Sequence, residues 1–332
     1  MRAEESTRRG TSKIFLKVSF TVLAFLVMLL LAEAILSLLN YHYSPIRIQV
    51  LNRTDKRHQL AFKEVFYVYD PGLIWRPRRS IGPFNSQGYR GEELPEEKKS
   101  GTLRIFAFGD SNTIGWLWPA DAPNYPLFLE RLLNEGLSEK KYVVTNAAAH
   151  GYSSYQGLKR FRESLRFKPD IALISFGAND ATELGITDEE FCRRDVRKLH
   201  IDELLINYKT GQLVLSLMDK LLVKRAKPVP RVSLEDYEKN IREMIRLARK
   251  SGITPILLTR PFRLQENEQD RKFPYNEATL RIGKQDHVPV LDLFLYFKDK
   301  SSCFMDSNHY NEDGMEKAAA LISSGIRPSL KK

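Results

Sequence analysis

An apolar run near the N-terminus is the strongest pattern in the chain. Residues 18–39 carry a single charge, Glu33, and a helix of this length can cross the ~30 Å hydrocarbon layer of a membrane. The residues before the run hold two glutamates and five basic side chains: Arg2, Arg8, Arg9, Lys13 and Lys17. The positive-inside rule then predicts that residues 1–17 are cytoplasmic, that residues 18–39 cross the cell membrane once, and that the rest is periplasmic or extracellular.

A cleaved signal peptide is the alternative interpretation of this run. Its uninterrupted part, residues 18–32, has the length of a signal peptide, and Ala32-Glu33-Ala34 resembles a small-x-small cleavage site. The apolar pattern resumes after this site, however, and continues to residue 39. We therefore expect an uncleaved signal anchor, which makes the lipid bilayer a partner of the N-terminal helix.

Beyond residue 100 the apolar pattern alternates between short continuous runs and amphipathic stretches. The continuous runs have strand length and cover residues 103–108, 142–147, 171–176, 253–259 and 288–293. The amphipathic stretches cover residues 126–136, 153–167, 234–250, 276–283 and 312–323. Continuous apolar strands separated by helices predict a central parallel five-stranded sheet covered by helices on both faces.

Two segments do not follow this alternation. Residues 40–100 connect the apolar run to the first strand, and we expect their glycine-punctuated, aromatic part to pack on the body. Roughly 75 residues separate the third and fourth strands, far more than one crossover helix needs. Helical patterns cover 188–200 and 201–224 within this stretch. We predict one domain over 101–330 with a helical insertion at 181–232, either a lid or a solvated decoration.

The net charge and the two cysteines argue against nucleic-acid binding and a zinc site, but they do not identify the function. Of the formal net charge of +11, the first 60 residues carry +5, so the body is only mildly basic. It has no Lys/Arg stripe interleaved with aromatic residues, and we expect no nucleic-acid binding. Cys192 and Cys303 either form a disulfide, which an exported protein permits, or stay unpaired. Their spacing supports no zinc site, and the sequence does not determine the oligomeric state.

Residues of complementary chemistry follow four of the five predicted strands. Ser111 follows the first strand, Gly151 the second and Asn179 the third, while Asp306 and His309 follow the fifth. Ligands bind at this edge of an open α/β sheet, so the four segments are predicted to meet in one crevice. His309 can take the proton of Ser111, and Asp306 can orient the imidazole. The Ser111 and Gly151 amides and the Asn179 side chain suit an oxyanion hole.

With these residues the chain resembles the SGNH hydrolases, the GDSL-type esterase superfamily, in a membrane-anchored bacterial form. The resemblance rests on four blocks in order, at residues 109–115, 146–151, 177–180 and 306–309. Asn112 stands where a leucine gave the family its older name, a variation that touches no catalytic role. The resemblance implies a flavodoxin-like three-layer α/β/α sandwich and Ser–His–Asp catalysis without metal or cofactor.

The leading hypothesis is a serine esterase that removes acyl groups, O-acetyl first, from an envelope or secreted glycan. The alternatives are an O-acyltransferase acting on a polysaccharide, a lipase or thioesterase, and a non-catalytic glycan-binding scaffold. The insertion carries a dense run of charges over residues 189–198, whereas a lipase lid would present a broad apolar face. This contrast favours a polymer substrate over a fatty chain.

Other polar and aromatic residues near the crevice have structural interpretations. Asp180 is expected to cap a loop or helix, and His150 to be structural or to contact substrate. Arg260 is expected on the surface or in an ion pair, with an anionic substrate group as the alternative. The indoles of Trp116 and Trp118 either stack on a sugar ring or pack beneath the insertion.

Overall fold

The chain divides into two compact units. The computed structural model describes residues 2–41, 43, 66–70, 72–117, 121–135, 140–193, 204–205, 207–223, 228–263 and 271–330. The first unit comprises residues 1–52 and 194–226, and the second comprises residues 53–193 and 227–332. The middle of the insertion thus groups with the N-terminal helix and not with the body.

The second unit is built on a sheet in which all neighbouring strands are parallel. Its strands are β3 (Thr102–Gly109), β4 (Lys141–Asn146), β5 (Ile171–Ser175), β8 (Thr254–Leu258) and β9 (Val290–Leu291). The spatial order β4-β3-β5-β8-β9 is the flavodoxin-like order, in which the strand order reverses between the first and third strands. Here that switch point lies between β3 and β5.

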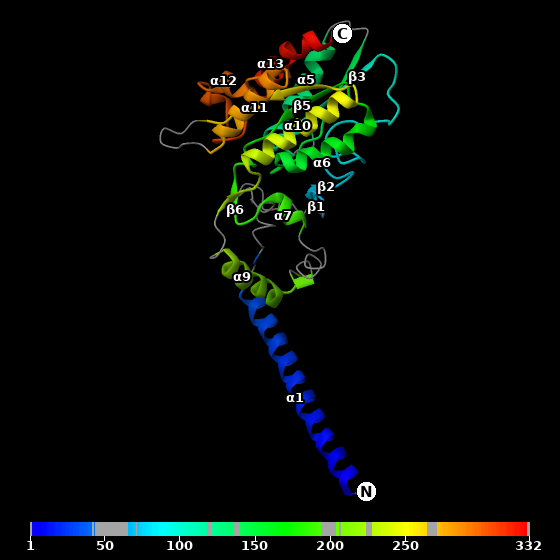
Figure 1. Cartoon of the computed structure of the whole chain (residues 1–332), viewed down its shortest axis with the longest axis vertical. Helices are drawn as coiled ribbons and strands as arrows, with labels where there is room; N and C mark the ends of the chain where they lie inside the picture. Colours follow the sequence, from blue (N-terminus) through cyan, green and yellow to red (C-terminus); the bar gives the residue numbers. More distant parts are fainter. Residues whose placement is uncertain are drawn as a thin grey trace. The chain divides into compact units, whose positions relative to one another are not determined.

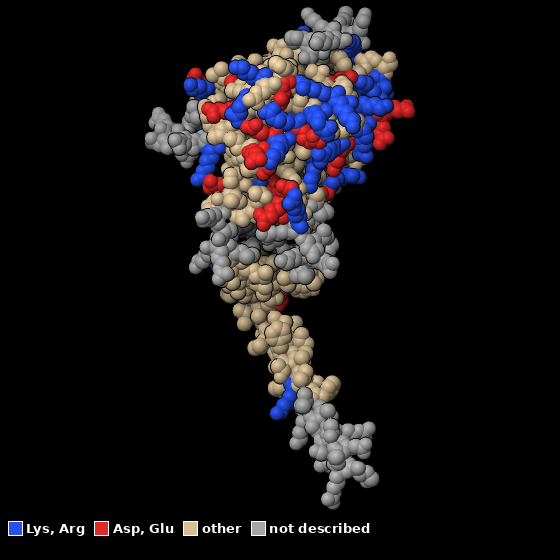
Figure 2. Space-filling view, viewed as in Figure 1, with Lys and Arg blue, Asp and Glu red and all other residues tan. Residues whose placement is uncertain are grey.

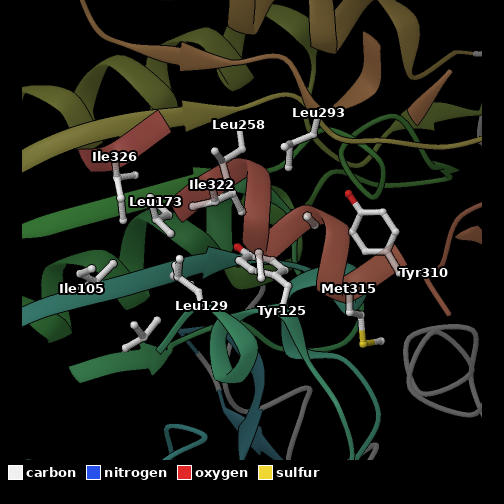
Figure 3. Packing of buried hydrophobic residues seen from close by; sticks show 14 of the residues in the cluster. Ile105, Tyr125, Leu129, Leu173, Leu258, Leu293, Tyr310, Met315, Ile322 and Ile326 are labelled. Carbon is white, nitrogen blue, oxygen red and sulfur yellow. The ribbon is translucent and has the colours of Figure 1, made fainter. Parts of the chain in front are cut away.

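The central strand β3 sends alternate side chains into two helical layers, as the two-residue period of a strand requires. Ile105 and Ala107 pack on the side of α5 (Tyr125–Asn134) and α13 (Glu312–Leu330), in the core shown in Figure 3. On the other face the Phe108 ring lies 5.0 Å from that of Phe161 in α6 (Ser154–Ser164). The helices α10 (Leu234–Lys250) and α11 (Phe273–Gln285) complete this second layer (Figure 1). The predicted three-layer α/β/α sandwich is confirmed.

Local sequence signals begin and end these helices. α6 starts with a capping box in which Ser153 and Gln156 satisfy each other's backbone amides. Ser233 caps the N-terminus of α10, and its side chain accepts a hydrogen bond from the Asp236 amide at 3.1 Å. Acidic residues in the first turn of α10 and basic residues in its last turn also match the helix dipole.

The described part of the connecting segment makes contacts with the sheet and its loops. It forms an antiparallel hairpin of β1 (Tyr67–Asp70) and β2 (Ile74–Pro77). Further along, the buried Arg104 of β3 donates to the carbonyl oxygens of Pro95 (2.6 Å) and Glu97 (3.1 Å). The charged stretch before β3 is therefore fixed through its backbone.

The insertion begins and ends in the body. β6 (Glu183–Leu184) pairs with β7 (Val229–Pro230) and joins its two ends, and α7 (Asp188–Arg193) follows β6. Its middle part, in the first unit, contains α9 (Lys209–Val223). The helix predicted over 201–224 corresponds to α9, which begins at Lys209. Of the helix predicted over 188–200, the structure describes α7 up to Arg193, and the rest of this prediction lies outside the described residues.

The first unit is dominated by α1 (Arg2–Leu38). Within it Phe15–Leu38, 24 residues, is long and apolar enough to cross a membrane, a test that a signal sequence also passes. Figure 2 shows this stretch almost free of charged atoms, whereas the visible face of the body mixes Lys and Arg with Asp and Glu.

Five predicted strands are present, but the fifth is shorter than its apolar run. Only Val290–Leu291 forms a strand, because Asp292 caps α12 (Leu293–Phe297) by accepting a hydrogen bond from the Leu295 amide. Of the two alternatives for the cysteines, the structure has the unpaired thiols, with Cys303 buried and Cys192 half-buried.

Candidate active site

Ser111 lies at the start of a short helix directly after β3. This helix is α4 (Ser111–Ile114), and Asp110 caps it by accepting a hydrogen bond from the Asn112 amide at 2.9 Å. Gly109 allows the close packing of the turn, because a Cβ there would lie 2.1 Å from Thr113 Oγ1 and 3.0 Å from the Ser175 carbonyl oxygen. The turn therefore holds Ser111 at the carboxyl edge of the sheet.

His309 lies in a loop whose shape is set by Asp306. One carboxylate oxygen, Oδ1, accepts hydrogen bonds from the amides of Asn308 (2.7 Å) and His309 (2.8 Å), and the other, Oδ2, lies 2.7 Å from His309 Nδ1. Desolvation opposes ionisation of Asp306, but the hydrogen bonds from His309 and Asn308 outweigh it and lower its pKa well below the usual value. The carboxylate is therefore ionised at neutral pH.

Ser111 and His309 are in direct contact. Ser111 Oγ lies 2.8 Å from His309 Nε2. Because Nδ1 faces an ionised carboxylate, we assign the ring proton to Nδ1, which leaves Nε2 to accept from the Ser111 hydroxyl. The structure thus brings Ser111, His309 and Asp306 together in one hydrogen-bonded chain.

A buried ion pair behind this chain joins the two loops. The guanidinium Nε of Arg260 lies 3.0 and 2.9 Å from the two carboxylate oxygens of Asp110, and the side chains are 2% and 1% exposed. Arg260 Nη1 also donates to the carbonyl oxygen of Asn308 at 2.9 Å. Of the roles expected for Arg260, the structure has the ion pair, which links the residue before Ser111 to the residue before His309.

The predicted oxyanion-hole donors lie on neighbouring loops. The Asn179 side chain donates to the Tyr152 carbonyl oxygen at 3.0 Å and approaches Asp110 Oδ2 at 3.5 Å, which places it between the Gly151 loop and the Ser111 turn. Gly151 has φ +73°, a conformation that favours glycine. The amides of Ser111 and Gly151 donate no hydrogen bond to any of the residues that the structure describes.

The hairpin of the connecting segment supports the Gly151 loop. Tyr67 Oη lies 3.0 Å from His150 Nδ1 and accepts from the His150 amide at 3.1 Å. Trp75 Nε1 donates to the His150 carbonyl oxygen at 3.0 Å. Desolvation, followed by the charges of His309 and Arg90, lowers the pKa of His150 to about 3. His150 is therefore neutral at ordinary pH, and its contacts join the hairpin to the Gly151 loop.

The ends of the insertion hold the same loop from another side. Arg231, which is 2% exposed, pairs with Asp188 at 2.8 Å and donates to the Gly151 carbonyl oxygen at 2.8 Å. Asp188 also accepts a hydrogen bond from Ser153 Oγ at 2.6 Å. The start and the end of the insertion therefore contribute directly to the position of Gly151.

Two buried arginines have roles that the sequence did not predict. Arg231 is described above, and Arg90 donates to the carbonyl oxygens of Ile114 (2.8 Å), Trp116 and Ala122 around the end of α4. No local signal could have found them, because an arginine that binds backbone carbonyls has no sequence spacing of its own.

The structure also locates Asp180 and Trp116, for which the sequence suggested roles. Asp180 accepts hydrogen bonds from the amides of Ser154 (2.9 Å) and Gly177 (3.0 Å), which is the expected capping role. Burial raises its pKa to about 6. Trp116 is 37% exposed, and the expectation for Trp118 lies outside the described residues.

A flavodoxin-like sheet with a serine, histidine and aspartate joined at its switch point places this chain in the class of SGNH-type α/β proteins. The model of the GDSL-like Lipase/Acylhydrolase family matches residues 107–317. The chain belongs to this family.

A curated relative is the acetylxylan esterase of Xylanibacter ruminicola, 22% identical over 245 residues. The match covers 71% of this chain and 45% of that protein, so the chain spans about half the length of this relative.

Solved structures of similar proteins include the lipase/acylhydrolase of Enterococcus faecalis. It has a TM-score of 0.48 and 24% identity, and the match covers 68% of this chain and 96% of that one. A GDSL-like lipase of Bacteroides thetaiotaomicron has a TM-score of 0.46 and 17% identity, with 71% and 93% of the two chains covered.

The buried ion pair between Asp110 and Arg260 predicts that replacing Arg260 lowers the stability of the protein strongly. Arg260→Met should lower the free energy of unfolding by about 3–5 kcal/mol, because it leaves the Asp110 carboxylate buried without its partner. Adding Asp110→Asn, which keeps an oxygen to cap α4, should recover part of this loss. Chemical denaturation of the full-length protein in detergent measures both.

The matched control is Arg246→Met in α10. Arg246 pairs with Glu243 at 2.6 Å, but its side chain is 60% exposed, so the change should stay within about 0.5 kcal/mol. Equal losses at Arg260 and Arg246, or a double variant less stable than Arg260→Met, would contradict the coupling between Asp110 and Arg260.

Proposed function

We propose that the chain is a serine esterase that removes short acyl groups, acetate first, from an envelope or secreted glycan, with Ser111 as nucleophile. The observation that carries the proposal is the hydrogen-bonded chain from Ser111 Oγ through His309 to Asp306, at 2.8 and 2.7 Å. A serine hydroxyl becomes an effective nucleophile when an oriented base takes its proton. The scaffold and the base are both present at the edge where α/β proteins bind ligands.

The mechanism proceeds through an acyl-enzyme. His309 Nε2 takes the Ser111 proton as Oγ attacks the ester carbonyl, and the ionised Asp306 stabilises the imidazolium. The negative charge that develops on the former carbonyl oxygen is held by the Ser111 and Gly151 amides and by Asn179 Nδ2. His309 then protonates the leaving alcohol and later activates the water that releases the acid.

Two observations support a glycan ester as substrate. The curated relative is an acetylxylan esterase, and the half-exposed Trp116 follows the nucleophile helix, where an indole can stack on a sugar ring. The same acyl-enzyme passes its acyl group to a sugar hydroxyl if water is excluded, so an O-acyltransferase is the alternative for this site. The assays described below also distinguish the esterase and the O-acyltransferase from a lipase or thioesterase and from a glycan-binding scaffold.

We propose further that α1 is an uncleaved anchor and that the body is extracytoplasmic. The contact that supports this is Glu33, whose carboxylate accepts hydrogen bonds from the backbone amides of Lys209 (2.7 Å) and Thr210 (2.8 Å). Cleavage after Ala34 would remove this carboxylate and leave the start of α9 without its cap. The five basic residues before the span orient it with the N-terminus inside.

The catalytic proposal predicts a non-additive loss of activity. Ser111→Ala and His309→Ala should each abolish nearly all turnover of p-nitrophenyl acetate, and the double variant should lose little more, because the two residues act as a unit. Asn179→Ala should lower kcat about 10²–10³-fold, the usual effect of one oxyanion donor. Ser324→Ala, at an exposed position of α13, is the control, and wild-type activity of Ser111→Ala would refute the mechanism.

The substrate proposal predicts a preference for short acyl groups. The purified protein should turn over C2 p-nitrophenyl esters faster than C8 or longer ones and should release acetate from O-acetylated polysaccharide. Ser111→Ala is the blank for both assays. A preference for long chains would favour a lipase. Acyl transfer to an added oligosaccharide without net release of acid would favour the transferase.

The topology proposal predicts the result of limited proteolysis. Protease added to spheroplasts should digest the body and spare an N-terminal tag, because only residues 1–17 are cytoplasmic. N-terminal sequencing should find an intact α1. A mature protein that begins at Ile35 would replace the anchor with secretion, and a cytoplasmic reporter active after Lys332 would reverse the orientation.

A further inference from the structure

α9 exposes a continuous apolar stripe that the catalytic site does not use. Its exposed side chains include a set of large apolar ones, namely Leu213, Val214, Leu217, Met218 and Leu221. Leu217 is 53% exposed and Leu221 69% exposed, whereas Gln212, Leu215 and Ser216 of the same helix are buried. A helix that packs on a core normally buries its apolar side and exposes its polar side. In α9 most of the described large apolar side chains are exposed instead.

The stripe occupies one side of the helix. At about 100° per residue, the five apolar side chains fall within an arc of about 140°, and the buried positions fall within another. Lys220, which is exposed, lies at the border of the stripe by the same count. α9 is therefore amphipathic, with its apolar side facing away from the packed side.

α9 is fixed to the end of the candidate membrane span. Besides its bonds to the two backbone amides, Glu33 accepts from Thr210 Oγ1 at 2.8 Å. Just past the end of α1, the Tyr43 amide donates to Gln212 Oε1 at 3.0 Å. Both ends of this contact lie in the first unit, and Figure 1 shows α9 at the C-terminal end of α1.

The depth of Glu33 follows from the length of the span. At 1.5 Å per residue, about 20 helical residues cross the ~30 Å hydrocarbon layer. Counted from Val18, the first residue of the proposed span, they end near Ser37. Glu33 and the first turn of α9 therefore lie about 6 Å inside the outer boundary of the hydrocarbon layer, where a carboxylate can be satisfied by donors.

We propose that α9 lies in the outer interface of the bilayer, with the stripe Leu213–Val214–Leu217–Met218–Leu221 among the upper acyl chains. An amphipathic helix in this position buries its apolar face about 5–10 Å into the boundary between headgroups and acyl chains. The inference rests on the proposed anchor, because the span sets the depth of α9. Its consequence is a second membrane contact at the middle of the insertion whose two ends hold Gly151.

We infer that lipid covers the stripe because α9 is joined to α1 near the end of the proposed span, where the chain leaves the membrane. Within the body, the exposed large apolar side chains of the helices α11 and α12 are Phe273, Leu280 and Leu295, and isolated ones of this kind are normal on a protein surface. Five contiguous ones on one helix side mark an interaction surface. The continuity with α1 makes lipid its occupant.

The test uses the full-length protein with an environment-sensitive NBD label. Single cysteines replace Leu217 or Leu221 in α9, Leu30 in α1, and Leu295 in α12, in a Cys192→Ala background; the remaining Cys303 is fully buried. Leu295 is the matched control, since it is an exposed helical leucine at 65% exposure. Each protein is reconstituted into phosphatidylcholine vesicles with a minor fraction of phosphatidylglycerol, with and without lipid that carries a nitroxide on the acyl chain.

We expect nitroxide lipid to lower the emission of the Leu217→Cys and Leu221→Cys labels about twofold or more, as it lowers that of Leu30→Cys, because all three lie among acyl chains. The Leu295→Cys label should be unaffected. Circular dichroism checks that each labelled protein is folded.

The outcomes separate the inference from the anchor on which it rests. Quenching at Leu30 without quenching in α9 would overturn the inference and keep the anchor. Blue-shifted but unquenched labels in α9 would show that protein, and not lipid, covers the stripe, which also overturns it. Quenching at neither α1 nor α9 would overturn both proposals.

Discussion

The buried ion pair between Asp110 and Arg260 is the interaction on which the geometry of the site depends. Removing two charges from water is unfavourable, and such a pair persists only if its remaining hydrogen-bonding groups are satisfied. Here Asp110 also caps α4, and Arg260 also binds the carbonyl oxygens of Asn308 and Pro261. The pair therefore holds the Ser111 turn against the His309 loop and contributes to the 2.8 Å distance between Ser111 Oγ and His309 Nε2.

The loop that carries Gly151 depends on segments from outside the sandwich. The β1–β2 hairpin holds it through Tyr67 and Trp75, and the insertion holds it through Arg231. An oxyanion hole acts through donors that are fixed before the reaction. In the proposed mechanism, these two segments therefore help to hold the Gly151 donor in place.

The insertion also contributes to the unit that contains the candidate membrane span. Its ends pair as β6 and β7 in the body, whereas its middle helix α9 is capped by Glu33 of the candidate span. The charge argument drawn from residues 189–198 described only one part of the insertion, because α9 carries the apolar stripe. A single insertion thus combines support for the active site with a surface suited to lipid.

The sequence by itself predicted the parallel sheet and the order of strands and helices along the chain, and it supplied the candidate residues of the site. Continuous apolar runs can only be buried in a parallel sheet covered on both faces, and their carboxyl ends place Ser111, Asn179 and His309 at one edge. The last strand was shorter than its run, since Asp292 begins a helix there. Only the tertiary structure decided the roles of Arg90, Arg231 and Arg260 and the partner of Glu33. Their partners are mostly backbone groups or distant carboxylates, and such contacts depend on where the folded chain passes and leave no periodic pattern in the sequence.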